Sequence, residues 1–502
     1  MRSFAFLIAC IGISAFAQTP APAEKKAPAP RIPQIETVTA AMKKAATAYR
    51  RYVSFNGGYA WSWPQDISTA QGENHSSPTL IMIQPPGTPA MGLCFLEAWR
   101  ATKDPLYLQA ANEAAQCLIW CQLSTGGWDS DFDFDPRRAV KYHFRRDLLA
   151  GETEPGSRHA ASTLDDNKTQ SALLFLLELA HTEPGKSDAD LQAALKFGMD
   201  GLLAAQEMNG GWPQHYRGPA DPTAPVKPAN YPKDWLHIWP NIDYTPHYTL
   251  NDGNLYWVMR LLLRAHALDH DPRYLAAAEK LGDFLLLARM PAPQPAWAQQ
   301  YDRDMQPVWA RKFEPPAISS VESLGALRTL VELWIATGDE KWLAPVPEVM
   351  AWFQRSKLPD GRWARFYELQ TNKPLYCKQK SYQLTYEDTD LPTHYGFKTD
   401  DDYQKDLDQV TATIAKGRET MLIGRAGPTE PRKWAKEAKS LIPKVNTALS
   451  TLTRQGFWLD EKKIDAGLFV KHLRAMTLYI TAAQNGGAPF KALLDSEAKA
   501  GK

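Results

Sequence analysis

The chain has 502 residues, and its 57 basic side chains nearly balance its 56 acidic ones, which leaves a net charge of +1. No basic stripe emerges from this balance, so the charge gives no case for a nucleic-acid partner. Hydrophobic residues make up 44% of the chain, as expected of a globular protein. The 17 tryptophans and 19 tyrosines are many, and we expect some to pack in the core and others to offer flat faces to sugar rings.

The first residues predict an export signal. An apolar run over residues 4–15 follows a basic start, and Ala15-Phe16-Ala17 has the small-x-small pattern of a cleavage site. The run is too short to span a bilayer. We assign residues 1–17 to a signal peptide and expect an exported protein, periplasmic or secreted; a lipoprotein signal ending at Cys10 is the alternative. Residues 18–34, rich in Pro, Ala and Lys, predict a disordered tether.

Four cysteines remain after cleavage: Cys94, Cys117, Cys121 and Cys377. Cys117 and Cys121 lie one helical turn apart, a spacing that suits a metal. No His or Asp stands at a matching spacing, so buried thiols or one disulfide are favoured, and an oxidising compartment permits the disulfide.

From residue 35 onward the sequence repeats a pair of helices. In the clearest copy, a nearly all-apolar run over residues 169–180 precedes an amphipathic stretch with Leu191, Leu195 and Leu202. Further copies cover residues 90–128, 254–288 and 321–363, and incomplete ones cover residues 35–59 and 401–484. Alternating inner and outer helices predict an all-α fold, an α/α toroid of repeated helix pairs with a few short strands. We place this domain at residues 35–485, ahead of a polar tail at 486–502.

A glycine-rich motif that ends in an aromatic residue closes each outer helix, as expected of a helix C-terminus. Its copies are Gly126-Gly127-Trp128, Gly210-Gly211-Trp212, Asn56-Gly57-Gly58-Tyr59 and Asp360-Gly361-Arg362-Trp363. Two long loops, 132–162 and 218–247, interrupt the repeat. Loops of this length are often functional, although a mobile surface insertion is the alternative.

Two inner helices begin with nearly the same residues, Thr163-Leu164-Asp165-Asp166-Asn167 and Thr249-Leu250-Asn251-Asp252-Gly253. A helix N-cap needs one such side chain, whereas each helix carries a polar pair. Inner helices start at the same end of a toroid, so the two acidic clusters should face each other across its mouth. Hard oxygen ligands gathered in this way suit Ca²⁺, and a His/Cys set for zinc is absent.

Arginines beside aromatic residues form a third group. They occur in Ala310-Arg311-Lys312-Phe313-Glu314 and in Trp363-Ala364-Arg365-Phe366-Tyr367-Glu368. The guanidinium group suits a bidentate grip on a carboxylate, and salt bridges to the nearby glutamates are the alternative. With the acidic clusters, these arginines predict a site for an acidic sugar polymer.

At these residues the chain resembles polysaccharide lyase family 10, the pectate lyases with an α/α toroid, over about residues 35–485. The resemblance is carried in order by Ser162-Thr163-Leu164-Asp165-Asp166-Asn167-Lys168-Thr169, Asn209-Gly210-Gly211-Trp212-Pro213-Gln214, Thr249-Leu250-Asn251-Asp252-Gly253, Ala310-Arg311-Lys312-Phe313-Glu314-Pro315-Pro316 and Trp363-Ala364-Arg365-Phe366-Tyr367-Glu368-Leu369-Gln370-Thr371-Asn372-Lys373-Pro374. It implies Ca²⁺-assisted anti-β-elimination on α-1,4-linked polygalacturonate.

The resemblance also implies roles for individual residues. Asp165 and Asp252 are expected to bind Ca²⁺ with Asp166 in support, and Arg311 is expected to be the catalytic base. The residues expected to bind substrate are Arg365, Lys373, Trp212 and Tyr216. Trp212 has an alternative role as a structural wedge between helices, because Trp128 stands in an equivalent place.

The chain departs from the family at two points. The family usually reads Asp-Asn-Gly-Ala-Thr where this chain has Asp165-Asp166-Asn167-Lys168-Thr169, so Lys168 is expected to weaken metal binding or to replace part of the metal's charge. Lys373 stands where the family has an Arg, and Lys378-Gln379-Lys380 contains no Arg where the family has another. The grip on the uronate should be looser, because Lys is a point charge and not a fork.

Three other functions compete with this one. An unsaturated-uronide hydrolase of toroid fold would use Asp165 and Asp252 as acid and base. A terpene-cyclase-like toroid is suggested by Asp129-Ser130-Asp131-Phe132-Asp133, but an exported protein with a polar cleft argues against it. A non-catalytic pectin-binding relative would be marked by Lys168 and the Lys378-Gln379-Lys380 change. In each case we expect a monomer with no nucleic acid or membrane partner.

Overall fold

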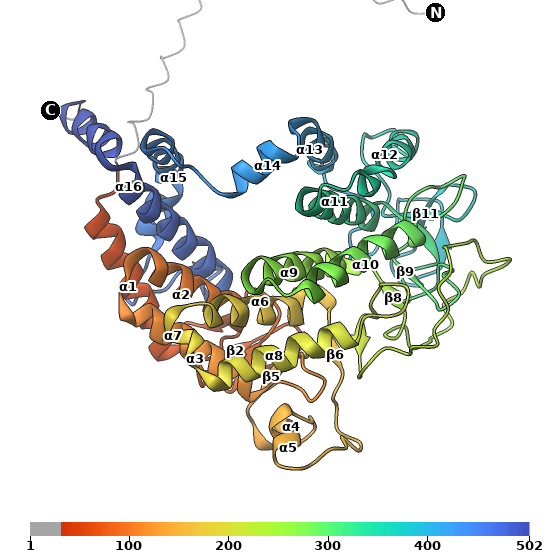
Figure 1. The fold of residues 1–502 in the computed structure, drawn as a ribbon, viewed down its shortest axis with the longest axis horizontal. Helices are drawn as coiled ribbons and strands as arrows, with labels where there is room; N and C mark the ends of the chain where they lie inside the picture. Colours follow the sequence, from red (N-terminus) through yellow and green to blue (C-terminus); the bar gives the residue numbers. More distant parts are fainter. Residues whose placement is uncertain (1–31, 501–502) are drawn as a thin grey trace, which may run out of the picture.

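The computed structural model describes residues 32–500. The predicted signal peptide and most of the predicted tether lie outside these residues. The inner helices, which pack against one another in sequence, are α16 (Ala466–Ala500), α2 (Thr88–Thr102), α6 (Lys168–Ala180), α9 (Asn254–Asp269) and α11 (Ser320–Thr337). Their outer partners are α1 (Ile35–Tyr52), α3 (Pro105–Trp120), α8 (Ala189–Ala204), α10 (Pro272–Ala288) and α12 (Val346–Arg355). The predicted α/α toroid is confirmed, with α1 as the outer partner of the last helix (Figure 1).

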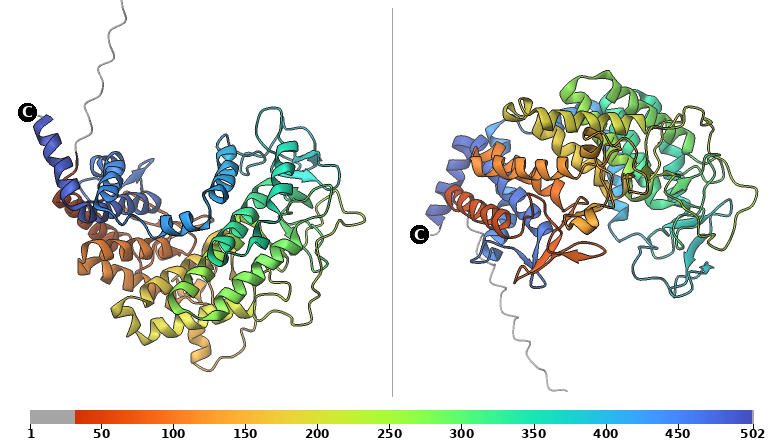
Figure 2. Two further views of the ribbon diagram at one scale, coloured as in Figure 1. Left: turned by 45° about the horizontal axis from the view of Figure 1, so that its top comes forward. Right: turned by 90° about the horizontal axis from the view of Figure 1, so that it is seen from below.

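The toroid is open on one side. The remaining pair, α13 (Tyr403–Lys416) and α15 (Pro431–Thr451), is split: α13 packs on α11, while α15 packs on α16. The short helix α14 (Arg418–Arg425) and the segment after it span the distance between them, and the helix pairs follow an open arc (Figure 2). The other helical segments are α4 (Pro136–Ala139), α5 (Arg145–Leu149), α7 (Glu183–Lys186), η1 (Asp165–Asn167), η2 (Asn251–Gly253) and η3 (Glu340–Leu343).

Most of the outer helices begin after a break that contains aspartate. The carboxylate of that aspartate accepts a hydrogen bond from a backbone N–H in the first turn, which satisfies a donor that the helix itself leaves unpaired. These caps are Asp104 on Leu106 in α3, Asp188 on Leu191 in α8 and Asp271 on Arg273 in α10, at 2.9–3.0 Å, and Asp339 caps the turn η3 ahead of α12 in the same way.

A tryptophan follows each of α3, α8, α10, α12 and α15 and ties the end of that helix to the segment before a later helix. Its indole N–H donates to a backbone carbonyl ten to twelve residues earlier. Its own carbonyl accepts the N–H of a residue shortly before α6, α9, α11, α13 or α16. The indole bonds, at 2.8–2.9 Å, are Trp128 to Leu118, Trp212 to Leu202, Trp297 to Leu285, Trp363 to Phe353 and Trp458 to Ala448. The carbonyl bonds are Trp128 to Thr163, Trp212 to Thr249, Trp297 to Ser319, Trp363 to Thr399 and Trp458 to Asp465. The aromatic motif is therefore a structural repeat, and Trp297 is a copy that no glycine precedes, whereas Gly456-Phe457-Trp458 has the spacing of Gly361-Arg362-Trp363.

Short strands precede the inner helices and pair antiparallel with the segment that follows a later tryptophan. In this way β6 (Ser162–Thr163) pairs with β7 (His215–Tyr216), β8 (Tyr248–Thr249) with β9 (Gln300–Tyr301), and β10 (Ala317–Ser319) with β11 (Phe366–Glu368). The other strands are β1 (Ser62–Pro64), β2 (Ala70–Gln71), β3 (Ser76–Ser77), β4 (Leu80–Met82), β5 (Asp131–Asp133), β12 (Pro374–Cys377), β13 (Leu384–Thr385), β14 (Leu459–Asp460) and β15 (Lys463–Asp465). Strands of two to four residues are too short to show the alternation by which strands are recognised in a sequence. The pairs bring the starts of α6, α9 and α11 to one rim.

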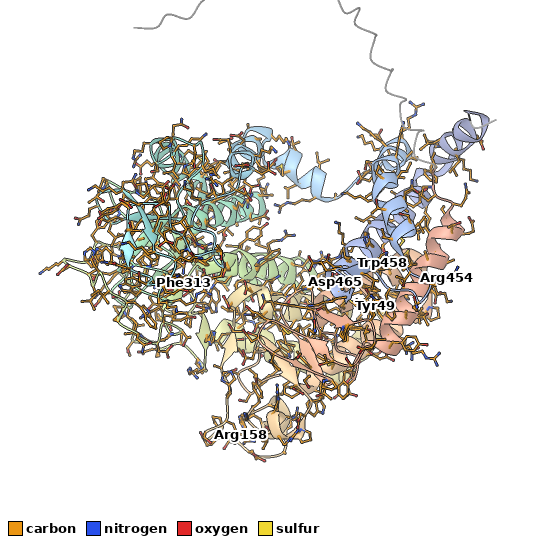
Figure 3. All side chains as sticks on the ribbon, turned by 180° about the vertical axis from the view of Figure 1, so that it is seen from behind. Tyr49, Arg158, Phe313, Arg454, Trp458 and Asp465 are labelled. Atoms are coloured by element: carbon orange, nitrogen blue, oxygen red, sulfur yellow. The ribbon has the colours of Figure 1, made fainter. Side chains whose placement is uncertain are left out.

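The two ends of the described chain meet at one end of the arc. The Tyr49 hydroxyl of α1 donates to the carbonyl of Asp465 at 2.9 Å, and its ring packs on Phe469. Figure 3 shows Tyr49, Trp458 and Asp465 together, with Phe313 in the opposite half of the molecule. Packed structure continues past residue 485, where the domain was expected to end: α16 kinks at Gly487, and the Phe490 ring beyond it is buried.

The four cysteines of the described chain are buried free thiols, so the sequence alternative of a disulfide is not realised. Burial raises the pKa of the Cys121 thiol to about 12, which keeps it protonated. Within residues 32–500, no helix combines the length and apolar character needed to cross a membrane.

Replacing Trp212 with alanine should lower the free energy of unfolding by about 3–5 kcal/mol, because a fully buried indole and its hydrogen bond to Leu202 are lost. Urea denaturation followed by circular dichroism measures this change. Trp120→Ala is the control, since that ring is 40% exposed and its loss should cost much less. Equal effects of the two substitutions would contradict a special structural role for Trp212.

Candidate active site

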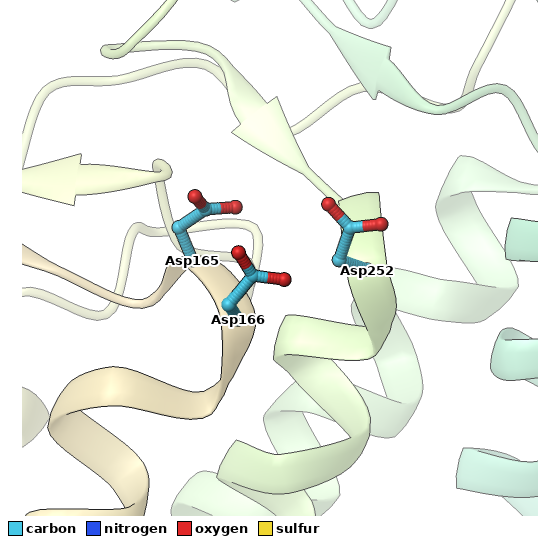
Figure 4. A group of neighbouring side chains, drawn as sticks. All are labelled: Asp165, Asp166 and Asp252. Carbon is cyan, nitrogen blue, oxygen red and sulfur yellow. The ribbon is translucent and has the colours of Figure 1, made fainter. Parts of the chain in front are cut away.

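Three aspartates meet at the rim where two neighbouring inner helices begin. Asp165 and Asp166 lie in the turn η1 before α6, and Asp252 lies in the turn η2 before α9. One carboxylate oxygen from each lies within 4.8 Å of the others, and Figure 4 shows the side chains directed to the space above the two helix starts. None of the three makes a capping hydrogen bond to its helix, so the N-cap interpretation does not account for them.

The two turns have the same backbone conformation, and Asp166 occupies in the first turn the position that Asp252 occupies in the second. Each of these residues has a left-handed backbone, with φ of 47° at Asp166 and 50° at Asp252. Such a conformation costs energy in a residue other than glycine and is concentrated at functional sites. In the same register, Asp165 corresponds to Asn251. Asp166 thus stands equivalent to Asp252, whereas the sequence analysis gave it only a supporting role.

A lysine approaches one half of the cluster. The Lys168 ammonium lies 3.0 Å from Asp165 Oδ2 and 3.7 Å from Asp166 Oδ2. Gln84, from the segment between β4 and α2, donates from Nε2 to Asp166 Oδ2 at 3.0 Å. The other half of the cluster is held by Asn251, whose Nδ2 donates to Asp252 Oδ2 at 2.6 Å.

Arg365 is the cation beside Asp252. Its Nη2 lies 3.7 Å from Asp252 Oδ1 and 2.9 Å from Oε1 of Glu322, whose side chain is fully buried in α11. Burial opposes the charge of Arg365, but the nearby anions, Glu322 foremost, outweigh it and raise the pKa above its ordinary value. Arg365 is therefore a permanently charged guanidinium at the edge of the acidic cluster.

Arg311 lies beside the same tyrosine as Arg365. Its Nε and Nη2 form a bidentate pair with Glu314, at 2.7 and 2.5 Å. The Tyr395 hydroxyl donates to Glu314 at 2.8 Å, and the Tyr395 ring lies 4.4 Å from the guanidinium of Arg365 and 5.6 Å from that of Arg311. Burial disfavours the charge of Arg311. The hydrogen bonds to Glu314 and the charge of Glu314 outweigh this effect and raise the pKa of Arg311. The free protein therefore holds Arg311 protonated, with 37% of its side chain exposed.

Burial raises the pKa of Asp252 to about 7. Arg365 acts in the opposite direction, while Glu322 and the other two aspartates of the cluster reinforce the rise. Burial, followed by the charge of Asp165, also raises the pKa of Asp166. Like charges held this closely disfavour ionisation, so a cation that binds among them would replace protons.

Two of the residues expected to bind substrate are buried, and a third lies outside the acidic cluster. Trp212 is fully buried and Tyr216 is 2% exposed, so neither ring offers a face to a sugar, and the prediction of stacking is wrong in this conformation. Lys373 lies at the turn between β11 and β12, beyond Glu368, whereas Arg365 precedes the start of β11. Three strand residues span about 10 Å, so the backbone of Lys373 is set back from that of Arg365, and its ammonium lies over the Tyr386 ring. Contact of Lys373 with a polymeric substrate stays a prediction.

Several residues of the site were not identified from the sequence. Glu322, Tyr395 and Gln84 come from segments without a recognised motif, and only the fold brings them to the rim. His215 pairs with Thr163 in the β6–β7 ladder, close to the charges of Asp165 and Lys168. Burial lowers the pKa of His215, so a neutral imidazole stands beside the aspartates at neutral pH.

The aspartates of the Asp129–Asp133 segment have other partners. Asp129 lies 3.1 Å from His159, and Asp133 lies 3.2 Å from Arg138. Asp131 lies near His75, and burial raises its pKa to about 6. These local pairs do not form the facing acidic clusters that a cyclase of diphosphate substrates requires, which leaves that alternative without support.

The acidic cluster fits a calcium ion. Ca²⁺ binds carboxylate oxygens at 2.3–2.6 Å, so two ligands of one ion lie at most about 5 Å apart. The spacing of 4.8 Å or less between the three aspartates meets this limit, and the described residues supply no other such group of His, Cys, Asp or Glu. The side chains are 19–33% exposed, so an ion can reach them from solvent.

Comparison with known proteins gives a family match. A family model described as pectic acid lyase matches residues 141–362, and this confirms the resemblance drawn from the sequence. The matched segment contains the three aspartates and Arg311, and it ends just before Arg365. No curated protein matches the chain significantly.

Solved structures of toroid enzymes are also similar to the chain. A mutant of a Family 10 polysaccharide lyase from Cellvibrio cellulosa, in complex with trigalaturonic acid, is 19% identical, with a TM-score of 0.45, over 66% of this chain and 98% of that one. A glycoside hydrolase family 76 mannosidase from Bacteroides thetaiotaomicron is 11% identical, with a TM-score of 0.43, over 89% and 98%. An unsaturated glucuronyl hydrolase specific for heparin is 10% identical, with a TM-score of 0.38, over 89% and 97%.

The raised pKa of Asp252 predicts a pH-dependent stability. Between its ordinary value of 3.8 and about 7, the folded protein binds a proton that the unfolded chain has released, so this contribution to stability is lost as the pH rises through that window. We expect the difference in unfolding free energy between the wild type and Asp252→Asn to fall from about pH 4 to about pH 7 and to level off above it. Urea unfolding in chelator at a series of pH values measures this, and a constant difference would contradict the shift.

Proposed function

We propose that this polysaccharide lyase, of the pectic acid lyase family, is a pectate lyase that cleaves α-1,4-linked polygalacturonate by Ca²⁺-assisted anti-β-elimination. One observation carries the proposal: three aspartates and two arginines of different segments meet at one rim of the toroid. The aspartates are negative side chains that can bind a divalent cation, and they lie next to arginines whose permanent positive charge can bind a carboxylate. A uronic acid in a polymer presents the carboxylate that links the two.

Arg365 is assigned to the uronate carboxylate. Its guanidinium is held in place by Glu322 and by the Tyr395 ring, so little side-chain freedom remains to be lost on binding. A carboxylate held between Arg365 and a cation at the aspartates loses much of its charge. When bound, Ca²⁺ acts as a Lewis acid on this carboxylate and so acidifies the C5 proton.

Arg311 is assigned to the proton at C5. In the elimination, the C5–H electron pair becomes the C4–C5 double bond, the C4–O bond breaks, and the departing oxygen takes up a proton. Arg311 accepts the C5 proton only in its deprotonated fraction, which Glu314 keeps small. The reaction should therefore be faster at alkaline pH. The neutral His215 is the rival base, and it would give a rate that no longer rises with pH in the alkaline range.

The hydrolase alternative fits the geometry less well. The acid and base of a glycoside hydrolase stand about 5–10 Å apart because part of the sugar or a water lies between them. Here one oxygen of each carboxylate lies within 4.8 Å of the others, and Asp165 is engaged by Lys168. This crowding favours a cation site. We further infer that the enzyme acts outside the cytoplasm, because its polymeric substrate is extracellular and residues 1–17 have the pattern of an export signal.

Asp252→Ala and Arg365→Ala should each reduce turnover of polygalacturonate about 10²- to 10³-fold, the usual cost of removing one electrostatic partner of a transition state. The measurement is the absorbance of the unsaturated product with Ca²⁺ and with a chelator, and Lys196→Met on the outer surface is the control. Products without the double bond would indicate the hydrolase, and binding without turnover in the wild type would indicate a non-catalytic relative.

Glu314→Gln tests the base. Loss of the anion lowers the pKa of Arg311, so the alkaline limb of the kcat/KM profile should move to lower pH, whatever happens to the maximal rate. His215→Ala should leave that limb in place. Wild-type turnover by Arg311→Ala, or an unchanged limb in Glu314→Gln together with loss of activity in His215→Ala, would transfer the role to His215.

A further inference from the structure

Lys168 is a buried cation within the acidic cluster. It is the first residue of α6, and 4% of its side chain is exposed. Lysine is almost never buried to this extent without an anionic partner. The partners here are Asp165 and Asp166, two of the three aspartates assigned to the metal.

The second copy of the turn has no such lysine. The first residue of α9 is Asn254, which is fully buried and neutral, and its Oδ1 accepts from the backbone N–H of Leu255. The cation near Asp252 is Arg365, which comes from another repeat and is tied to Glu322. A neutral residue thus suffices for the fold at this position, and the charge of Lys168 calls for another explanation.

The position of the ammonium conflicts with a metal on the same carboxylates. Lys168 Nζ lies 3.0 Å from Asp165 Oδ2, the distance of a charge-assisted hydrogen bond, and it occupies a direction from which a cation would bind that oxygen. An ion 2.3–2.6 Å from the same oxygen would stand only a few ångströms from a positive charge.

We propose that Lys168 is a built-in counter-ion of Asp165 and Asp166, which neutralises the acidic cluster in the metal-free protein and competes with Ca²⁺ for it. The inference rests on the proposed cation site and goes beyond it: the chain holds its active-site turn in shape without metal and binds the metal weakly. Calcium binding then requires the lysine to give up at least one of its two carboxylates.

The repulsion sets the size of the effect. A single and a double positive charge about 4 Å apart repel by about 2 kcal/mol even at the dielectric constant of water, which corresponds to roughly 30-fold in affinity. Neutral substitution of Lys168 should therefore tighten Ca²⁺ binding by roughly 10- to 100-fold.

Isothermal titration with CaCl₂, without substrate, compares the wild type with Lys168→Met, which keeps the length of the side chain and removes its charge. Lys168→Gln, which keeps a hydrogen-bond donor, serves if the methionine variant does not fold. Lys196→Met is the matched control, because Lys196 also pairs with an aspartate, Asp200, but on the outer surface. Thermal unfolding of each protein in chelator and in CaCl₂ is the second readout.

We expect a Kd for Ca²⁺ 10- to 100-fold lower in Lys168→Met or Lys168→Gln than in the wild type. We also expect a lower Tm of these variants in chelator that CaCl₂ restores, and wild-type behaviour of Lys196→Met. Equal Kd values in the wild type and the neutral variants, including no detectable binding in either, overturn the inference, as does a wild-type Tm of the variants in chelator. The proposed function fails separately, by absence of turnover on polygalacturonate.

Discussion

The arrangement of the whole molecule depends on one repeated interaction, the hydrogen bonds of a buried tryptophan that follows α3, α8, α10, α12 and α15. The indole N–H ties the ring to its own helix, and the backbone carbonyl ties the same residue to the strand before an inner helix. Each tryptophan thereby fixes where an inner helix starts. Because Trp128 and Trp212 act in this way on neighbouring helices, the turns that carry Asp166 and Asp252 arrive at the same height on one rim.

The charges at this rim are balanced in two halves. Lys168 forms ion pairs with Asp165 and Asp166. Arg365, which is also paired with Glu322, is the cation beside Asp252. The left-handed turns that present the aspartates are strained, and such strain persists only where the surroundings enforce it. A substrate carboxylate and its cation would enter a site whose groups are already placed, so that little reorganisation is left for the reaction itself.

Trp212 illustrates why an aromatic residue in a carbohydrate-acting protein is ambiguous in a sequence. A flat face for a sugar and a wedge between helices need the same side chain, and the neighbouring glycines are compatible with both. The structure supports the wedge, because Gly211 packs against Phe284 and the Trp212 indole is fully buried. The repeat of the same bonds at Trp297 and Trp458, where no double glycine precedes the ring, shows that the interaction and not the motif is the repeating feature.

The sequence by itself determined the helix pairs, the two acidic turns and the resemblance to the pectic acid lyases, because these depend on apolar periodicity and on short runs of neighbouring residues. Tertiary structure alone decided that α1 completes the last pair and that the toroid stays open at α14. It also decided that Glu322 and Tyr395 lie beside Arg365, whereas the Arg311–Glu314 pair was an alternative already open in the sequence. The reason is physical: the partners of Arg365 are 43 residues away at Glu322 and 30 at Tyr395, and contacts of that separation follow from the packing of several helices, which no local pattern encodes.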